Sequence, residues 1–237
     1  MNVRLALLPL LLAATACFGD SQSVLVNQRD AARQLDPGQR TPGVPRVVFL
    51  GDSLTFGLGM DSRDDAWPAL VAARLEQEGV KIQALNAGVS GETTNGGLER
   101  LPGLLELKPD VVVVALGAND AISGNAVGRA RENLTQIVSQ SQKAGAKVLV
   151  AGLRLPRRLL DRENGNYDSL WLDLGSDFGI PVVRDMMDGV FDGPGMVQPD
   201  GVHPTLSGQQ RIAANVEPYL REVLDGMRLP APQLGTL

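Results

Sequence analysis

The sequence contains one cysteine, Cys17, and one histidine, His203, among its 237 residues. A single cysteine excludes an internal disulfide and any metal site built from several cysteines. A single histidine leaves one candidate for chemistry that needs an imidazole base near neutral pH.

Basic charge and aromatic side chains are also scarce. The net charge is −5 and only 4% of the residues are aromatic, so the chain offers neither a basic field for phosphates nor a platform for stacked bases. This composition argues against nucleic acid as a partner. The length and the ordinary apolar and charged fractions are those of a globular protein with a real core.

Long apolar runs are absent as well, because no segment approaches the ~20 residues of a membrane-spanning helix. Residues 5–12 form a short apolar run broken only by Pro9, and small residues follow it up to Cys17. This pattern predicts a secretory signal over residues 1–16 and therefore an exported protein, periplasmic or in the cell envelope.

Two kinds of processing fit the end of this signal. Ala14-Thr15-Ala16 matches a site for ordinary signal peptidase, and the same residues with Cys17 resemble a bacterial lipobox. The lipobox carries Ala14 where leucine is preferred. We favour lipidation of Cys17, which would attach the protein to a membrane.

The remaining chain divides into three parts. Residues 17–45 are polar and interrupted by proline and glycine, which predicts a flexible tether. Residues 46–226 form the predicted domain, and residues 227–237 form a frayed tail.

Within the domain, β-branched runs alternate with amphipathic stretches. The predicted strands are Arg46–Leu50, Lys81–Leu85, Val111–Leu116, Lys147–Ala151 and Pro181–Val183. The predicted helices are Trp67–Glu78, Gly97–Leu105, Ala126–Ala144 and Leu206–Leu224, with Thr205 as a capping residue of the last. This alternation predicts a three-layer α/β/α domain, of the flavodoxin-like kind, with a five-stranded, mainly parallel sheet.

Four short motifs fall at the ends of these strands or before the last helix. They are Gly51–Leu54 (GDSL), Asn86–Gly88 (NAG), Gly117–Asp120 (GAND) and Asp200–His203 (DGVH). Loops at the carboxyl ends of parallel strands converge on one crevice, where ligands bind. Each motif alone could be a turn or a helix cap, but four in one crevice favour a catalytic site.

In this order the motifs resemble the conserved blocks of the SGNH/GDSL hydrolase family, over about residues 46 to 222. The sequence is most similar to its bacterial arylesterase, lysophospholipase and acyl-CoA thioesterase group. Residues 91–102, Leu153–Pro156 and Met196–Pro199 carry the finer resemblance. Ala118 replaces a glycine that is usual in the group, and residues 157–167 differ from it, so chain-length preference does not carry over.

The chemistry of the residues agrees with what the resemblance implies. Ser53 would attack an acyl carbonyl, His203 would accept its proton, and Asp200 would orient the imidazole. The resulting oxyanion would be bound by the backbone N–H groups of Ser53 and Gly88 and by the side-chain amide of Asn119. No metal or other cofactor is required.

Other acids of these loops receive no chemical role. Asp52 and Asp120 are expected to shape their loops, and Glu92, Glu99 and Asp110 to be solvated or capping side chains.

The sequence thus predicts a serine esterase acting on small-molecule carboxylic esters or thioesters. A carbohydrate-ester deacetylase of the same family remains an alternative, and a non-enzymatic envelope lipoprotein is a more distant one. The oligomeric state is left open.

Overall fold

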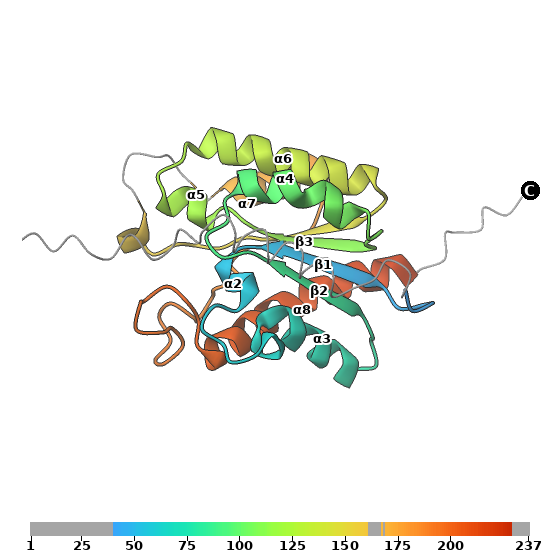
Figure 1. Ribbon diagram of the computed structural model, residues 1–237, viewed down its shortest axis with the longest axis horizontal. Helices are drawn as coiled ribbons and strands as arrows, with labels where there is room; N and C mark the ends of the chain where they lie inside the picture. Colours follow the sequence, from blue (N-terminus) through green and yellow to red (C-terminus); the bar gives the residue numbers. More distant parts are fainter. Residues whose placement is uncertain (1–39, 161–166, 168, 229–237) are drawn as a thin grey trace, which may run out of the picture.

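The computed structural model describes residues 40–160, 167 and 169–228, and they form a five-stranded parallel sheet between two layers of helices (Figure 1). The strands are β1 (Arg46–Gly51), β2 (Gln83–Gly88), β3 (Val111–Ala115), β4 (Lys147–Ala151) and β5 (Val182–Val183). Their order across the sheet is β2-β1-β3-β4-β5. This confirms the predicted fold class, because it is the flavodoxin-like order.

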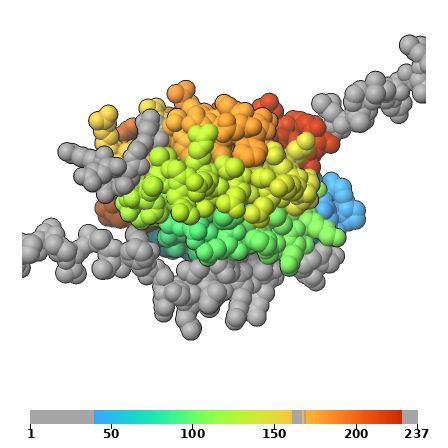
Figure 2. Space-filling model, turned by 90° about the horizontal axis from the view of Figure 1, so that it is seen from above, coloured from blue at the N-terminus to red at the C-terminus, as the bar shows by residue number. Residues whose placement is uncertain are grey.

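Helices cover both faces of the sheet. The helical elements are α2 (Ser53–Phe56), η1 (Arg63–Asp65), α3 (Trp67–Gln77), α4 (Thr94–Leu105), α5 (Ala118–Ile122), α6 (Val127–Lys143), η2 (Arg157–Leu159), α7 (Leu170–Phe178) and α8 (Leu206–Arg228). Helices α3 and α8 pack together on one face, and α4, α6 and α7 lie on the other (Figure 1). Seen from that second side, α4, α6 and α7 form a continuous layer (Figure 2).

The core sits around the central strands. Every residue of β1 and β3 is buried, as expected for parallel strands covered by helices on both faces. Trp67 of α3 is also fully buried and packs edge-to-face on Phe49 of β1, with ring centroids 5.1 Å apart. Burial of this much apolar surface is the main favourable term in folding.

The structure differs from the predicted elements at several boundaries and in its short helices; helix α4, for example, begins at Thr94 rather than Gly97. Strand β2 runs to Gly88 rather than ending at Leu85, so the Asn86–Gly88 motif belongs to the strand. Helices α2, α5 and α7 were not predicted; they have only four, five and nine residues. Helices α2 and α5 span only about one turn each, which is too short for a clear apolar period.

The strand order fixes where a ligand can bind. Strand β1 pairs with β2 on one side and with β3 on the other. The chain runs from β1 outward to β2 and then crosses back to β3, so the direction in which strands are added reverses between β1 and β3. In open α/β sheets this reversal opens a crevice at the carboxyl ends of the strands. Ser53 follows β1 and Asn119 follows β3, so both lie at that position.

The predicted signal, Cys17 and most of the tether fall outside the described residues, as does the tail from residue 229. The last helix, α8, extends to Arg228. In the described part of the chain, no helix combines the length and apolar character needed to cross a bilayer.

Gly88 allows the backbones of β2 and α2 to touch. A Cβ atom at this position would lie 2.2 Å from the backbone nitrogen of Phe56. We expect Gly88→Ala to lower the free energy of unfolding by about 1–3 kcal/mol, as overpacked core substitutions do, and to lower activity by displacing the helix that begins at Ser53. Gly103→Ala is the matched control, because a Cβ there meets nothing within 4 Å. Thermal melting of both variants tests this, and equal melting temperatures would contradict it.

Candidate active site

Ser53 lies where strand β1 turns directly into helix α2. Asp52 is the N-cap of that helix, and its Oδ1 accepts a hydrogen bond from Leu54 N at 3.0 Å. Asp and Ser favour such positions because their side chains satisfy the first free N–H groups of a helix. The turn places Ser53 in a buried position, 8% exposed, at the carboxyl end of β1.

The structure brings Ser53, His203 and Asp200 together across 150 residues of sequence. His203 Nε2 lies 3.0 Å from Ser53 Oγ. His203 Nδ1 lies 2.7 Å from Asp200 Oδ2. An ionised carboxylate can only accept, so Nδ1 carries the hydrogen and Nε2 is left to accept the serine proton. This is the arrangement of a serine triad.

The Asp200 carboxylate is held by its own loop. Its Oδ1 accepts from the backbone N–H groups of Val202 at 2.8 Å and His203 at 3.0 Å. Partial burial acts to raise the pKa of Asp200, but these hydrogen bonds and the His203 ring more than offset it, and the net pKa is lowered. The aspartate is therefore ionised at neutral pH.

Two glutamines, which the sequence analysis did not identify, tie the histidine loop to the serine loop. Gln198 Nε2 donates to Leu58 O at 2.8 Å and to Pro204 O at 2.9 Å. Gln209 of α8 is fully buried; its Oε1 accepts from Trp67 N at 2.9 Å, and its Nε2 donates to Leu54 O at 3.4 Å.

Thr205 Oγ1 accepts from Gly208 N at 3.3 Å, as predicted for the residue that caps α8.

Asn119 lies in the first turn of α5, close to the serine loop. Its Nδ2 donates to the backbone carbonyl of Glu92 at 3.0 Å and approaches Asp52 Oδ2 at 3.4 Å. The first bond is short and the second is long, so one amide hydrogen is firmly held and the other is weakly engaged. A hydrogen bond as long as 3.4 Å is weak, so little is lost when this hydrogen turns to another acceptor.

Gly88 does not have the free N–H that the sequence analysis expected. Its backbone N–H donates at 3.0 Å to the side-chain Oδ1 of Asn86, which lies two residues earlier in β2. Gly91 lies three residues further on, partly exposed in the turn after β2, with a φ of 77°. Among the described residues, no hydrogen bond from the Gly91 N–H is found. The sequence signal that could have identified it is a glycine between a strand and a helix, because glycine readily adopts a positive φ.

Three carboxylates are buried beside this crevice: Asp52, Glu92 and Asp120. The pKa of Asp52 is raised to about 7, mainly by burial and to a smaller extent by the charges of Glu92 and Asp120, while the hydrogen bond from the Leu54 N–H acts to lower it. Glu92 was expected to be a solvated or capping side chain, but it is paired with Arg100 inside the protein. Asp120 accepts from both the N–H and the hydroxyl of Thr94 at the start of α4, which agrees with a loop-shaping role.

The raised pKa of Asp52 predicts a pH-dependent stability. Between the unfolded value of about 4 and the folded value of about 7, the native state binds more protons than the unfolded state. Asp52 therefore reduces the free energy of unfolding as the pH rises through this window. We expect the difference in free energy of unfolding between Asp52→Asn and the wild type to favour the variant increasingly as the pH rises from 5 to 8. Melting temperatures across pH 5–8 test this, and a difference that is constant or grows toward pH 5 would contradict it.

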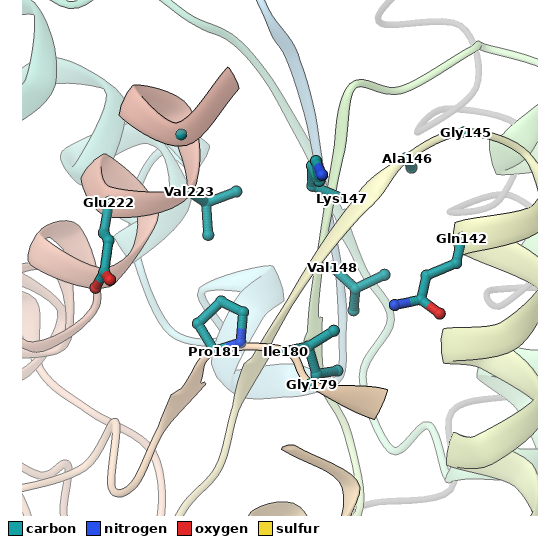
Figure 3. Close-up of a pocket in the computed structure, with 11 residues that line it drawn as sticks. Gln142, Gly145, Ala146, Lys147, Val148, Gly179, Ile180, Pro181, Glu222 and Val223 are labelled. Atoms are coloured by element: carbon teal, nitrogen blue, oxygen red, sulfur yellow. The ribbon is translucent and has the colours of Figure 1, made fainter. Parts of the chain in front are cut away.

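A hollow of about 680 Å³ lies at the other end of the strands (Figure 3). It is bordered by Lys147 at the start of β4, by Pro181 just before β5 and by Val223 of α8. Ser53, Asn119 and His203 do not line it. Its place at the amino ends of the strands sets it apart from the crevice that holds the triad. Among the described residues, no group of three or more His, Cys, Asp or Glu side chains could hold a metal ion.

Comparison with known proteins agrees with this geometry. Residues 49–211 match the model of the GDSL-like Lipase/Acylhydrolase family. The chain belongs to this family. It is 36% identical to esterase TesA of Pseudomonas aeruginosa over 202 residues, which cover 85% of this chain and 94% of TesA. It is 34% identical to thioesterase 1/protease 1/lysophospholipase L1 of Escherichia coli over 175 residues, 73% of this chain and 82% of that protein.

The fold of this GDSL-like hydrolase agrees with a solved relative. A crystal structure of TesA superposes with a TM-score of 0.71 at 36% identity, covering 75% of this chain and 99% of that one. These findings confirm the resemblance stated from the four motifs. The protein is an enzyme of the ester-hydrolysing class.

Proposed function

We propose that this protein is a serine esterase that hydrolyses carboxylic esters and thioesters through an acyl-serine intermediate. The observation that carries the proposal is the 3.0 Å separation of His203 Nε2 and Ser53 Oγ, with Asp200 on the other ring nitrogen. That distance permits direct proton transfer from the serine hydroxyl to the imidazole. The names of the relatives, esterase and thioesterase 1/lysophospholipase L1, support the same substrate classes.

The reaction proceeds in two steps. Ser53 Oγ attacks the acyl carbonyl while its proton passes to His203 Nε2, and the proton then goes to the departing alcohol or thiol. Water attacks the acyl-serine in the second step, again losing its proton to His203, which returns it to Ser53 Oγ. Asp200 stabilises the imidazolium that forms each time.

The negative charge on the substrate oxygen needs donors that are already in place. We assign this role to the Ser53 N–H and the Asn119 amide, as expected from the sequence. We assign the third position to the Gly91 N–H in place of that of Gly88, since the Gly88 N–H donates to Asn86.

Hydrolysis of p-nitrophenyl esters from acetate to palmitate, and of acyl-CoA thioesters, tests the proposal on the purified domain. We expect activity in the wild type and its loss in Ser53→Ala. A maximum at medium or long chains supports lipid or thioester substrates, whereas activity on acetate alone favours the carbohydrate-ester deacetylase. A folded wild-type protein with no activity on any of these substrates would count against the enzyme and favour the binding lipoprotein.

We also propose that the protein is exported and attached to a membrane through a lipidated Cys17. The apolar run and the small residues before Cys17 support this. Fractionation of cells that express the full chain tests it against a Cys17→Ser variant. The variant should leave the membrane fraction, and retention there would show that Cys17 is not the anchor.

A further inference from the structure

An ion pair lies inside the protein directly behind the catalytic loops. Arg100 of α4 contacts the Glu92 carboxylate through its Nε, which lies 2.8 Å from both carboxylate oxygens, and through its Nη2. The side chains are 6% and 3% exposed. Gly96 lies in the first turn of α4, one turn before Arg100. A Cβ at Gly96 would approach Glu92 Cγ to 3.1 Å, so this glycine makes room for the Glu92 side chain.

Each member of the pair also makes a backbone contact with the site. Arg100 Nη2 donates to the carbonyl of Gly51 at 3.2 Å, and Gly51 is the last residue of β1, two before Ser53. The carbonyl of Glu92 accepts from Asn119 Nδ2 at 3.0 Å. One continuous chain of contacts therefore runs from the serine loop through Arg100 and Glu92 to the side-chain amide of Asn119.

The cost of this arrangement argues for a purpose beyond stability. Removing two charges from water is unfavourable, and apolar residues of similar volume often stabilise a protein as well as a buried ion pair does. What an arginine adds is a rigid, two-point geometry. Here that geometry sets the distance between the loop that carries the nucleophile and the residue that carries an oxyanion donor.

We propose that Arg100 and Glu92 form a positioning pair that holds the Asn119 amide in register with Ser53 for oxyanion binding. The inference rests on the proposed esterase function and deepens it. Neither side chain contacts the substrate in this account; both act through Asn119 and the serine loop. The effect should therefore fall on the chemical step rather than on substrate binding.

A double-mutant cycle on p-nitrophenyl butyrate tests the proposal. We expect Arg100→Met to lower kcat about tenfold with KM nearly unchanged, since the lost contacts matter in the transition state. In an Asn119→Ala background the same substitution should cost less than about twofold, because residues that act through one another are not additive. Equal factors in the two backgrounds would overturn the proposal, as would wild-type kcat in Arg100→Met.

Two further variants separate positioning from a loss of folding. Arg100→Lys keeps the charge but loses the two-point geometry, and Glu92→Gln keeps the backbone carbonyl but loses the ion pair. Both should show intermediate kcat values in protein that still unfolds cooperatively, with a lower melting temperature in Glu92→Gln because Arg100 is left buried without its counter-ion; normal kcat in both would overturn the proposal. Arg131→Met is the matched control, because it removes an arginine paired with Asp173 and Asp177 on the surface, and its kcat should not change.

The Ser53→Ala variant and the double-mutant cycle together distinguish the esterase proposal from the positioning proposal. A fully active Ser53→Ala protein would refute the esterase mechanism and this inference together. Activity that depends on Ser53, combined with additive effects of Arg100 and Asn119, would refute only the positioning pair.

Discussion

Replacing His203 by alanine is expected to lower kcat/KM for ester hydrolysis by about 10⁴-fold or more, the size of effect seen when a serine triad loses its base. The effect is large because the sequence contains no second histidine and the carboxylates near Ser53 have other partners. Asp52 caps α2, Glu92 pairs with Arg100, and Asp120 binds Thr94. None of these three carboxylates is placed to substitute for the imidazole.

The measurement is steady-state hydrolysis of p-nitrophenyl butyrate by purified His203→Ala beside the wild type. Melting temperatures show whether the variant is folded, and Arg131→Met again serves as a control for surface substitution. A folded His203→Ala protein that retains more than about 1% of the wild-type kcat/KM would contradict the proposed role. Such a decrease, less than about a hundredfold, is too small for the loss of the only general base of a triad.

Replacing Asn119 by alanine is expected to lower kcat by about 10²- to 10³-fold, as the loss of one oxyanion donor does in other enzymes. KM should change little, because the donor binds the oxygen most strongly when the negative charge develops. Asn119→Asp should be at least as damaging, since it replaces the amide donor with a carboxylate that, once ionised, can only accept hydrogen bonds and repels the oxyanion.

The control is Asn95→Ala, because Asn95 is an exposed residue of α4 whose side chain donates to Glu99. Its kcat should remain near that of the wild type. A loss in Asn119→Ala that appears only as a higher KM would show that Asn119 binds the substrate rather than the transition state.

The sequence predicted the sheet and named the residues of the proposed triad because both depend on strong local patterns. Apolar runs such as Val111–Ala115 define parallel strands, and the strand ends place Ser53 and Asn119 in one crevice. His203 and Asp200 are separated by only three residues, and their motif precedes a long amphipathic helix, so the site could be outlined without coordinates.

The sequence did not identify the backbone N–H donor of the proposed oxyanion hole with the same success. Strand β2 ends three residues beyond its predicted boundary, and within it the Gly88 N–H donates to the side chain of Asn86, a contact that the motif alone does not reveal. Sequence patterns locate an element better than they locate its last residue. The register of β2 on β1, in which Gly88 pairs with Gly51, depends on tertiary contacts.

Glu92 illustrates a second limit. A glutamate is rarely fully buried unless it is paired, so the sequence analysis expected Glu92 to be a solvated or capping side chain. Its burial depends on Arg100, whose Nη2 also reaches Gly51 of a strand about fifty residues earlier. Such a pair becomes visible only when the fold brings the elements together.

The most direct test of the account is the mass of the protein after reaction with a p-nitrophenyl alkylphosphonate. Attack by a serine releases p-nitrophenol and leaves the phosphonyl group on Oγ, because the phosphonate mimics the tetrahedral intermediate. The account predicts one adduct per chain, mapped to Ser53 by peptide mass spectrometry, and none in Ser53→Ala. An adduct on another residue, or a folded wild-type protein that forms no adduct, would contradict it.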